Sequence, residues 1–288
     1  MNQQDQEQSV SDKMDVSGLK VIHPVYKSAD SVMPFMHALK LAQQSHGELE
    51  IVDVRSEEEA LEHIGVRSVL ERWGLLPPGA HRHDLAQLGL KVKKVVKTGN
   101  KRKEILKRID KRAHDLLVIG TERKSFLNLF HRNLAEFLSE SFPDATLLVS
   151  PSAKPFVNEE NGSLSLNTIL IPLADNETLD VSLNYLFYFL SFFPQLRPTV
   201  VGLHAGSSFP EILRPAQEKF HWIETVRSEP VTEAIVNAAR IYNADVILMP
   251  TWGRIHLAQK FTGTFTEQVW YSAPCPVLSV PMDFEVSE

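Results

Sequence analysis

Cysteine is nearly absent from this sequence of 288 residues, which contains only Cys275. A single cysteine excludes an intrachain disulfide, and this composition fits a protein of the reducing cytoplasm. Long hydrophobic runs are also absent. The longest, from Leu183 to Phe193, falls well short of the roughly 20 residues that a membrane-spanning helix needs. We therefore expect a cytoplasmic protein without membrane contact, in which this run forms a buried helix.

Positive charge is not in excess, because the formal net charge is −6. A negative chain argues against general nucleic-acid binding, so nucleic acid is not expected as a partner. The exception is the segment 91–112, where eleven lysines and arginines face two carboxylates, for a local charge of +9. Such a run is usually a solvated surface, or it attracts the acidic C-terminal half of the chain. A polyanion contact is the alternative, although no aromatic residues are interleaved.

Motifs for catalysis are missing as well. The sequence has no nucleophile elbow, no P-loop lysine motif and no zinc-protease motif. His81 and His83, beside Asp84, lack a further ligand at a recognised spacing, so we expect a solvated loop and no metal site. Cys275 stands between two prolines just before an apolar strand, where a buried structural role is expected. We therefore predict that the protein is not an enzyme.

The sequence is instead marked by an internal duplication. Asp115 aligns with Asp245 at an offset of 130, and Pro143 with Pro274 at an offset of 131. Each copy reads as a buried strand, a loop, a helix and a second buried strand. Upstream, Val21–Val25 matches Ile169–Leu173 at an offset of 148, so the first copy has about 18 extra residues, which we place within 66–85 as a surface connection.

Strands that alternate with helices predict an α/β fold with a parallel sheet and helices on both faces. We expect a disordered tail over 1–17, a first domain over 18–151, a linker over 152–166 and a second domain over 167–282. The remaining predicted strands are 49–54, 91–96 and 116–119 in the first domain, and 199–204, 221–226 and 246–249 in the second. The predicted helices run from 32 towards Gly47, over 102–113, over 181–193 and over 231–242.

The loop after strand 246–249 is a candidate phosphate site. Gly253 and Gly263 allow backbone N–H groups to approach phosphate oxygens, and Arg254 adds a positive charge. Thr264 opens a helix, whose N-terminus favours an anion. The alternative is plain helix capping, since Thr264 and Glu267 also form a capping-box pattern, T-x-x-E. In the first copy, Asn133 and Glu136 keep the capping pattern, while Arg123 and Arg132 replace the glycines.

At these residues the chain resembles the universal stress protein (UspA-like) family. Its hallmark is a loop G-x2-G-x9-G-[S/T], then a helix and a segment like APCPVL. Here Gly253, Gly263 and Thr264 match the last three loop positions, Pro250 replaces the first glycine, and Ala273–Leu278 match the final segment. The resemblance implies two tandem Rossmann-like domains of the adenine nucleotide alpha-hydrolase-like type. Each would have a five-stranded parallel sheet with helices on both faces.

The family also implies partners. Some members bind ATP, and single-domain members pair through their fifth strands. In a tandem chain that pairing would be an intramolecular pseudo-dimer between Ala145–Val149 and Val277–Val280. An aspartate after the first strand contacts adenine in ATP-binding members. The first domain has Tyr26 there, and the second has Ala174 with Asp175 one place later. A homodimer through other faces stays open.

We therefore predict a tandem universal stress protein, a non-catalytic stress-response regulatory or binding module, with ATP as cofactor in the C-terminal domain only. The first domain is not expected to bind ATP in the family manner. The alternatives are a structural or interaction protein without nucleotide, and a weak ATP-hydrolysing switch. The residues predicted to bind nucleotide are Pro172, Asp175, Met249, Thr251, Gly253, Arg254, Gly263 and Thr264.

Overall fold

The structure of the chain is a computed structural model. It describes residues 18–25, 32–55, 65–81, 83–121, 133–206, 219–251 and 264–284. The predicted tail over 1–17 therefore lies outside the described residues.

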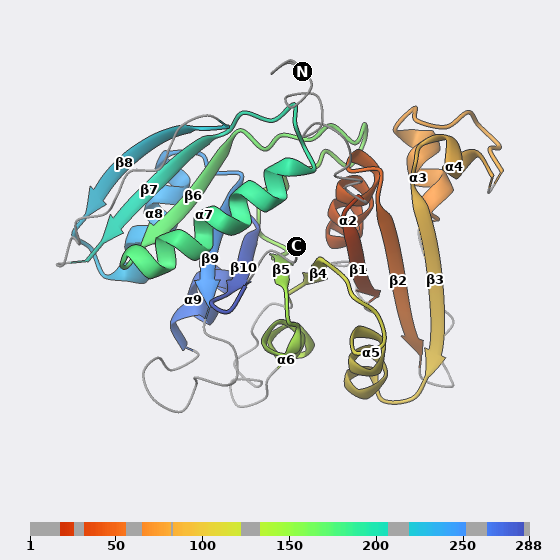
Figure 1. Cartoon of the computed structure of the whole chain (residues 1–288), viewed down its shortest axis with the longest axis horizontal. Helices are drawn as coiled ribbons and strands as arrows, with labels where there is room; N and C mark the ends of the chain where they lie inside the picture. Colours follow the sequence, from red (N-terminus) through yellow and green to blue (C-terminus); the bar gives the residue numbers. More distant parts are fainter. Residues whose placement is uncertain are drawn as a thin grey trace, which may run out of the picture.

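The N-terminal half alternates strands and helices along the chain (Figure 1). Its five strands agree with the predicted ones to within two residues at each end. The elements are β1 (Lys20–Val25), α2 (Val32–Gln44), β2 (Glu48–Arg55), α3 (Val66–Arg72), α4 (Asp84–Gln87), β3 (Lys91–Thr98), α5 (Lys101–Ile109), β4 (Leu116–Gly120), α6 (Leu134–Ser141) and β5 (Ala145–Val149).

The C-terminal half repeats this order without counterparts of α3 and α4 in its described residues. One boundary was predicted wrongly: α7 begins at Asn176 rather than at residue 181. Its first turn is polar and started by an Asp175 cap, which the apolar pattern does not reveal. The elements are β6 (Thr168–Leu173), α7 (Asn176–Ser191), β7 (Thr199–Ala205), β8 (His221–Arg227), α8 (Val231–Ile241), β9 (Val246–Thr251), α9 (Thr264–Ser272) and β10 (Val277–Pro281).

All ten strands form one sheet, in the order β3-β2-β1-β4-β5-β10-β9-β6-β7-β8. Neighbouring strands within each half are parallel. The halves join where β5 and β10 pair antiparallel, with Leu148 opposite Val277 and Thr146 opposite Ser279. The predicted fifth-strand pairing is thus confirmed. As a consequence, β3 and β8 lie at the two ends of the sheet (Figure 1).

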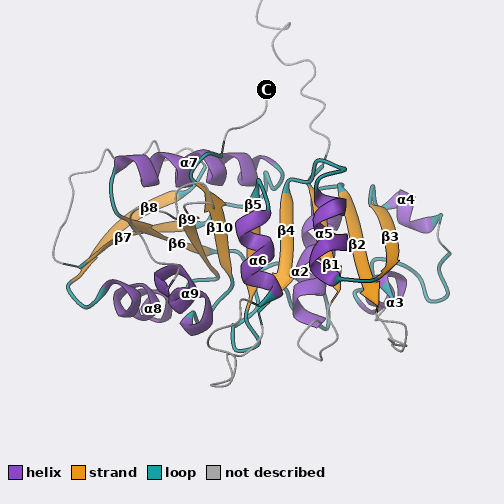
Figure 2. Ribbon diagram, turned by 90° about the horizontal axis from the view of Figure 1, so that it is seen from below, coloured by secondary structure: helices purple, strands orange, loops and turns teal. Residues whose placement is uncertain are grey.

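Both faces of the sheet are covered, because most strands carry apolar side chains on both sides. One core packs α2, α3 and α7 against the sheet, and the other packs α5, α6, α8 and α9 against the opposite face. Figure 2 shows α7 on one side of the C-terminal strands and α8 and α9 on the other. Cys275 is buried in the second core, as expected for a structural residue.

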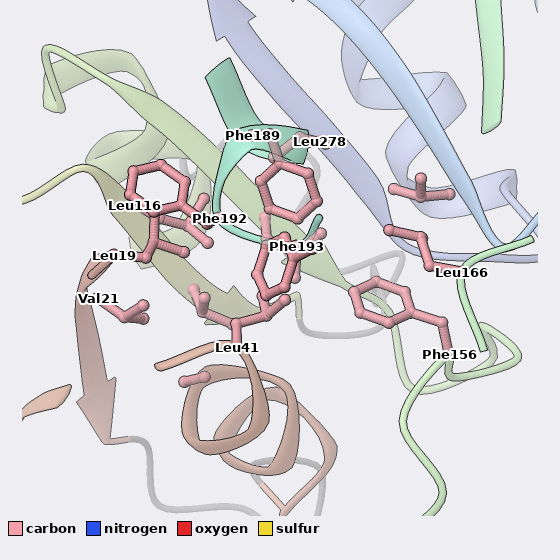
Figure 3. Packing of buried hydrophobic residues seen from close by; sticks show 14 of the residues in the cluster. Leu19, Val21, Leu41, Leu116, Phe156, Leu166, Phe189, Phe192, Phe193 and Leu278 are labelled. Carbon is pink, nitrogen blue, oxygen red and sulfur yellow. The ribbon is translucent and has the colours of Figure 1, made fainter. Parts of the chain in front are cut away.

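The first core runs continuously across both halves. Phe189, Phe192 and Phe193, at the end of α7 and just beyond it, gather with Leu41 of α2 and with Leu116 of β4 (Figure 3). The predicted buried character of the run 183–193 is therefore confirmed for these residues. Among the described residues, no helix combines the length and apolar character needed to cross a bilayer.

The segment predicted as a linker packs tightly on the N-terminal half. Phe156 is buried, its backbone N–H donates to His37 Nε2 (3.3 Å), and its ring meets the His37 ring edge-on. The Trp73 indole N–H donates to the Glu159 carbonyl (3.0 Å). Gly162 lies against the face of the same indole. The polar sequence of the segment hides these contacts, because its few apolar side chains are the ones that face inward.

The extra residues of the N-terminal half also differ from the prediction. They form α3, α4 and the turns between them, and they bury Val69, Leu70, Trp73 and Leu76 in the first core. The segment is therefore not a mere surface connection. It covers part of the sheet face, and it supplies the tryptophan on which the linker segment packs.

The first part of the basic run 91–112 forms β3, which lies at the end of the sheet remote from the C-terminal half. Another part of the run neutralises Glu50, a fully buried carboxylate of β2. The Arg108 guanidinium binds both Glu50 oxygens, and Arg112 Nη1 lies 3.1 Å from Oε2. Burial alone would raise the pKa of Glu50, but the hydrogen bonds from Arg108, together with the nearby His114 ring (Nε2 3.7 Å from Oε2), hold it well below its usual range.

Candidate functional site

The predicted residues Pro172, Met249 and Thr251 lie towards the carboxyl ends of β6 and β9, which are neighbours in the sheet. Ligands of open α/β sheets bind beyond such ends. Met249 is buried in the second core, and its predicted contact with nucleotide stays a prediction. The Thr251 hydroxyl lies 2.8 Å from Ser279 Oγ on β10. Thr251 therefore ties the two strands together where the candidate loop begins.

Asp175 follows β6 as predicted, and the structure gives its carboxylate a local task. Asp175 Oδ1 accepts from the Thr178 backbone N–H (2.8 Å) and from the Thr178 hydroxyl (2.9 Å). In return, the Asp175 N–H donates to the Thr178 hydroxyl (3.2 Å), which completes a capping box for α7. One carboxylate oxygen is thus used to start the helix.

Most of the candidate loop lies outside the described residues. Gly253, Arg254 and Gly263 lie outside the described residues, and so does the side chain of Thr264. The backbone of Thr264 begins α9, a helix of nine residues with Glu267 in its first turn. The predicted helix start is therefore confirmed, while the loop contacts stay predictions.

The corresponding place in the N-terminal half is described in detail from Asn133 onwards. Asn133 Oδ1 accepts from the Glu136 backbone N–H (2.8 Å), and Glu136 Oε2 accepts from the Asn133 N–H (3.0 Å). This is the capping box predicted from the sequence. Tyr26, Arg123 and Arg132, the other residues predicted to distinguish this half, lie outside the described residues.

A side chain from the other half closes this helix start. The Tyr271 hydroxyl, on α9, accepts from the Asn133 amide and donates to Glu136 Oε1 (2.6 Å). Partial burial and the Glu136 carboxylate both raise the pKa of Tyr271, so the hydroxyl keeps its proton and remains a donor. Asn133 occupies the position that carries a hydroxyl in the phosphate-binding pattern, and here it is committed to the cap and to Tyr271.

The sequence provided no indication of Tyr271. A comparison of the two copies shows that this contact between the halves is asymmetric. At the offset of 131, the residue of α6 that corresponds to Tyr271 is Glu140. An ionised carboxylate accepts hydrogen bonds but cannot donate one to Glu267 as the tyrosine does to Glu136. The start of α6 is therefore closed by a donor from the partner half, and α9 has no tyrosine at the matching position to close it in this way.

A second asymmetry lies on the second strand of each half. By strand register, Asp53 of β2 and His204 of β7 occupy equivalent positions. The Asp53 carboxylate lies 2.7 Å from the Arg55 guanidinium and 3.9 Å from Lys94 Nζ. His204 Nε2 instead lies 3.4 Å from Glu224 Oε2, and Glu224 also accepts from the Trp222 indole (3.0 Å). The two halves thus place opposite types of ionisable group near corresponding strand ends.

Two other candidate features are a histidine pair and a small apolar cavity. His83 Nε2 pairs with Asp84 (3.0 Å), and no group of three potential metal ligands occurs in the described part of the chain. An apolar cavity of about 10 Å³ lies in the first core near Phe156, Leu166 and Phe189. That volume is close to what a single water needs, so the cavity is too small for a nucleotide.

A sequence profile described as the Universal stress protein family matches residues 20–151 and 203–281. A universal stress protein from Archaeoglobus fulgidus DSM 4304 has a similar structure, with a TM-score of 0.62 at 15% identity, over 91% of this chain and 96% of that chain. A functionally unknown protein from Pseudomonas aeruginosa PAO1 gives 0.56 at 13% identity, over 91% and 92%. No curated protein matched the sequence.

Proposed function

Because this chain belongs to the universal stress protein family, we propose that it is a tandem stress-response regulatory and binding module whose C-terminal domain alone binds adenine nucleotide. The observation that carries the proposal is the closed start of α6. Asn133 and Glu136 are held there by Tyr271, while the matching residue opposite α9 is Glu140. The duplication therefore leaves one helix start, that of α9, as the candidate anion site.

The residues of the C-terminal half fit a nucleotide in their chemistry. The start of α9 offers backbone N–H groups and the positive end of a helix dipole, which favour a phosphate. Gly253 and Gly263 would allow the loop backbone to approach the phosphates, Thr264 would add a hydroxyl, and Arg254 a charge-assisted contact. Pro172 and Thr251 flank the strand ends at which the base and sugar would lie.

We propose a non-catalytic role, because the sequence offers no positioned nucleophile and base. A cytoplasmic location is part of the same proposal. Cys275 is buried, and burial raises the pKa of its thiol to about 12, so it is poorly suited to disulfide exchange and does not require an oxidising compartment. The competing functions are an interaction protein without nucleotide and a weak ATP-hydrolysing switch.

Matched variants at the two helix starts test the proposal. Thr264→Ala and Asn133→Ala change the two residues that the duplication aligns at the starts of α9 and α6, and each removes a side chain that the sequence pattern predicts to cap its helix. Only the first removes a predicted phosphate contact, which is worth about 1.5–3 kcal/mol for a hydrogen bond to a charged group. Isothermal titration with ATP should therefore show at least tenfold weaker binding for Thr264→Ala and unchanged binding for Asn133→Ala.

The outcomes separate the competing functions. Mass spectrometry of nucleotide released from the purified native chain gives a first answer, and Gly263→Val provides a second loop variant. If the native chain does not bind ATP at millimolar concentration, the nucleotide module and the ATPase both fail, and the interaction protein remains. If ATP binds and no phosphate is released over hours, the ATPase alone fails. An equal loss of affinity in Asn133→Ala would show that the C-terminal assignment is wrong.

A further inference from the structure

The terminal strand β3 presents an open backbone edge. It pairs with β2 without interruption, from Lys91 opposite Glu48 to Thr98 opposite Arg55. Within the described part of the chain, no strand lies beside its other edge. β3 is eight residues long and contains no proline, so its outer edge offers a regular row of N–H and C=O groups. Such an edge can accept one more strand.

Lysines surround this edge, and the carboxylates of the fold do not neutralise all of them. Lys93 and Lys94 each lie 3.9 Å from a carboxylate of β2. Lys91, Lys97, Lys103 and Lys111 are exposed, and none of them forms a salt bridge with a carboxylate among the residues that the structure describes. Lys97 and Lys103 lie near Glu104 and help to lower its pKa, but that one carboxylate also binds Lys107. Positive charge therefore remains along β3 and α5 after the internal ion pairs are made.

The architecture itself does not demand this charge, as the other end of the sheet shows. β8 is the equivalent terminal strand, with His221 and Arg227 at the positions of Lys91 and Lys97 by strand register. From His221 to Tyr242 the chain has two arginines and no lysine. The two terminal strands, β3 and β8, occupy equivalent places in the duplicated fold but differ in charge. The positive charge is therefore specific to β3.

The lysines select what this edge can bind. A second β3 would bring like charges together, which disfavours pairing between copies of the chain. An extended strand with carboxylates at alternate positions would instead place them roughly 7 Å apart on one face, the spacing of Lys91, Lys93 and successive side chains on that face of β3. RNA is the poorer match, since residues 91–112 contain no aromatic side chain on which a base could stack.

We propose that the outer edge of β3 binds an extended acidic segment of a partner protein, which adds to the sheet as an eleventh strand. Backbone hydrogen bonds to β3 hold the segment, and the lysines of β3 and α5 select acidic side chains. The inference is independent of nucleotide binding, because β3 belongs to the N-terminal half and lies at the end of the sheet away from α9 (Figure 1).

The test uses the native chain and a fluorescent ten-residue peptide that alternates glutamate with threonine. Two further peptides carry N-methyl groups on the odd or on the even residues, so one of them cannot donate hydrogen bonds to β3. Fluorescence anisotropy should show binding of the plain peptide and a loss of at least tenfold for one N-methylated peptide. Equal binding of all three peptides would show that charge attraction alone holds them, without backbone hydrogen bonds to β3, and would overturn the proposal.

Protein variants complete the test. Lys91→Glu with Lys97→Glu should weaken peptide binding at least tenfold, and the matched pair His221→Glu with Arg227→Glu on β8 should leave it unchanged. Circular dichroism and the urea midpoint check that each variant is folded. No binding of the plain peptide at millimolar concentration, or binding of single-stranded poly(U) in its place, would refute strand addition of an acidic segment.

Discussion

Asp144 is a partly buried carboxyl at the seam between the two halves, directly before β5. Burial, followed by the nearby charges of Asp115 and Asp283, raises its pKa from 3.8 to about 6, and His114 opposes this in part. We predict that Asp144→Asn stabilises the protein at pH 8 and has little effect at pH 4. The reason is that the native chain must ionise an unfavourably placed carboxyl at the higher pH.

The direction in which pH changes the free energy of unfolding follows from proton binding. At pH 4 the folded chain keeps the proton on Asp144, and the unfolded chain keeps it about half of the time. Between pH 4 and 6 the unfolded chain loses its proton first, so the free energy of unfolding falls as pH rises and levels off above pH 6. The full difference in pKa corresponds to about 3 kcal/mol. Because the carboxyl is only partly buried, solvent screening reduces the expected effect to about 1–2 kcal/mol.

Urea unfolding of both proteins at pH 4 and pH 8 measures this difference. Asp180→Asn, at an exposed position on α7, is the matched control and should change the free energy of unfolding by less than about 0.5 kcal/mol at either pH. The reasoning fails if Asp144→Asn destabilises the chain at pH 8. It also fails if the variant and the native chain differ by the same amount at both pH values, since the effect would then not depend on ionisation.

Three further predictions concern contacts that the fold creates between distant segments. Glu50→Gln leaves two arginines without their buried carboxylate and should cost about 2–4 kcal/mol in urea unfolding at pH 7, whereas Glu48→Gln, at a partly exposed pair, should cost less than about 1 kcal/mol. Tyr271→Phe removes the hydroxyl that joins α9 to the start of α6 and should lower the thermal midpoint by the equivalent of about 1–2 kcal/mol, and an unchanged midpoint would show that the contact contributes nothing. Gly162→Ala should cost about 2–4 kcal/mol, because φ is +65° and the new Cβ would lie 2.3 Å from the Trp73 ring. Gly74→Ala is the control for the backbone cost alone, about 1 kcal/mol, because φ is +70° there and the added Cβ would meet no atom within 4 Å. Equal losses of stability in the two variants would contradict the packing argument.

Much of the fold could be predicted because its signals are local. Apolar runs such as Val21–Val25 and Ile169–Leu173 predict buried parallel strands, and the offset between them reveals the duplication. The cap at Asn133 was also predictable, since a capping box involves residues only three positions apart. The start of α7 was missed because its first turn is polar, although the Asp175 and Thr178 cap follows the same local rule.

The candidate site was only partly predictable. The sequence identified a loop between β9 and α9 by its glycines, and it distinguished the two halves by what replaces those glycines. It did not reveal that Met249 is buried in the second core, because strand periodicity alone does not tell which end residues point into a core. It also gave no sign of Tyr271, whose partner Glu136 is 135 positions away.

What the sequence determined by itself is therefore the set of elements, their order and their duplication, because each depends on neighbouring residues and on hydrophobic spacing. Only the tertiary structure decided which groups meet across the chain. It placed Arg108 on the buried Glu50, Trp73 on the linker segment and Tyr271 on the start of α6. These contacts join residues that are 58 to 135 positions apart. Their geometry is set by the antiparallel junction of β5 with β10 and by helix packing on the sheet, which no local pattern encodes.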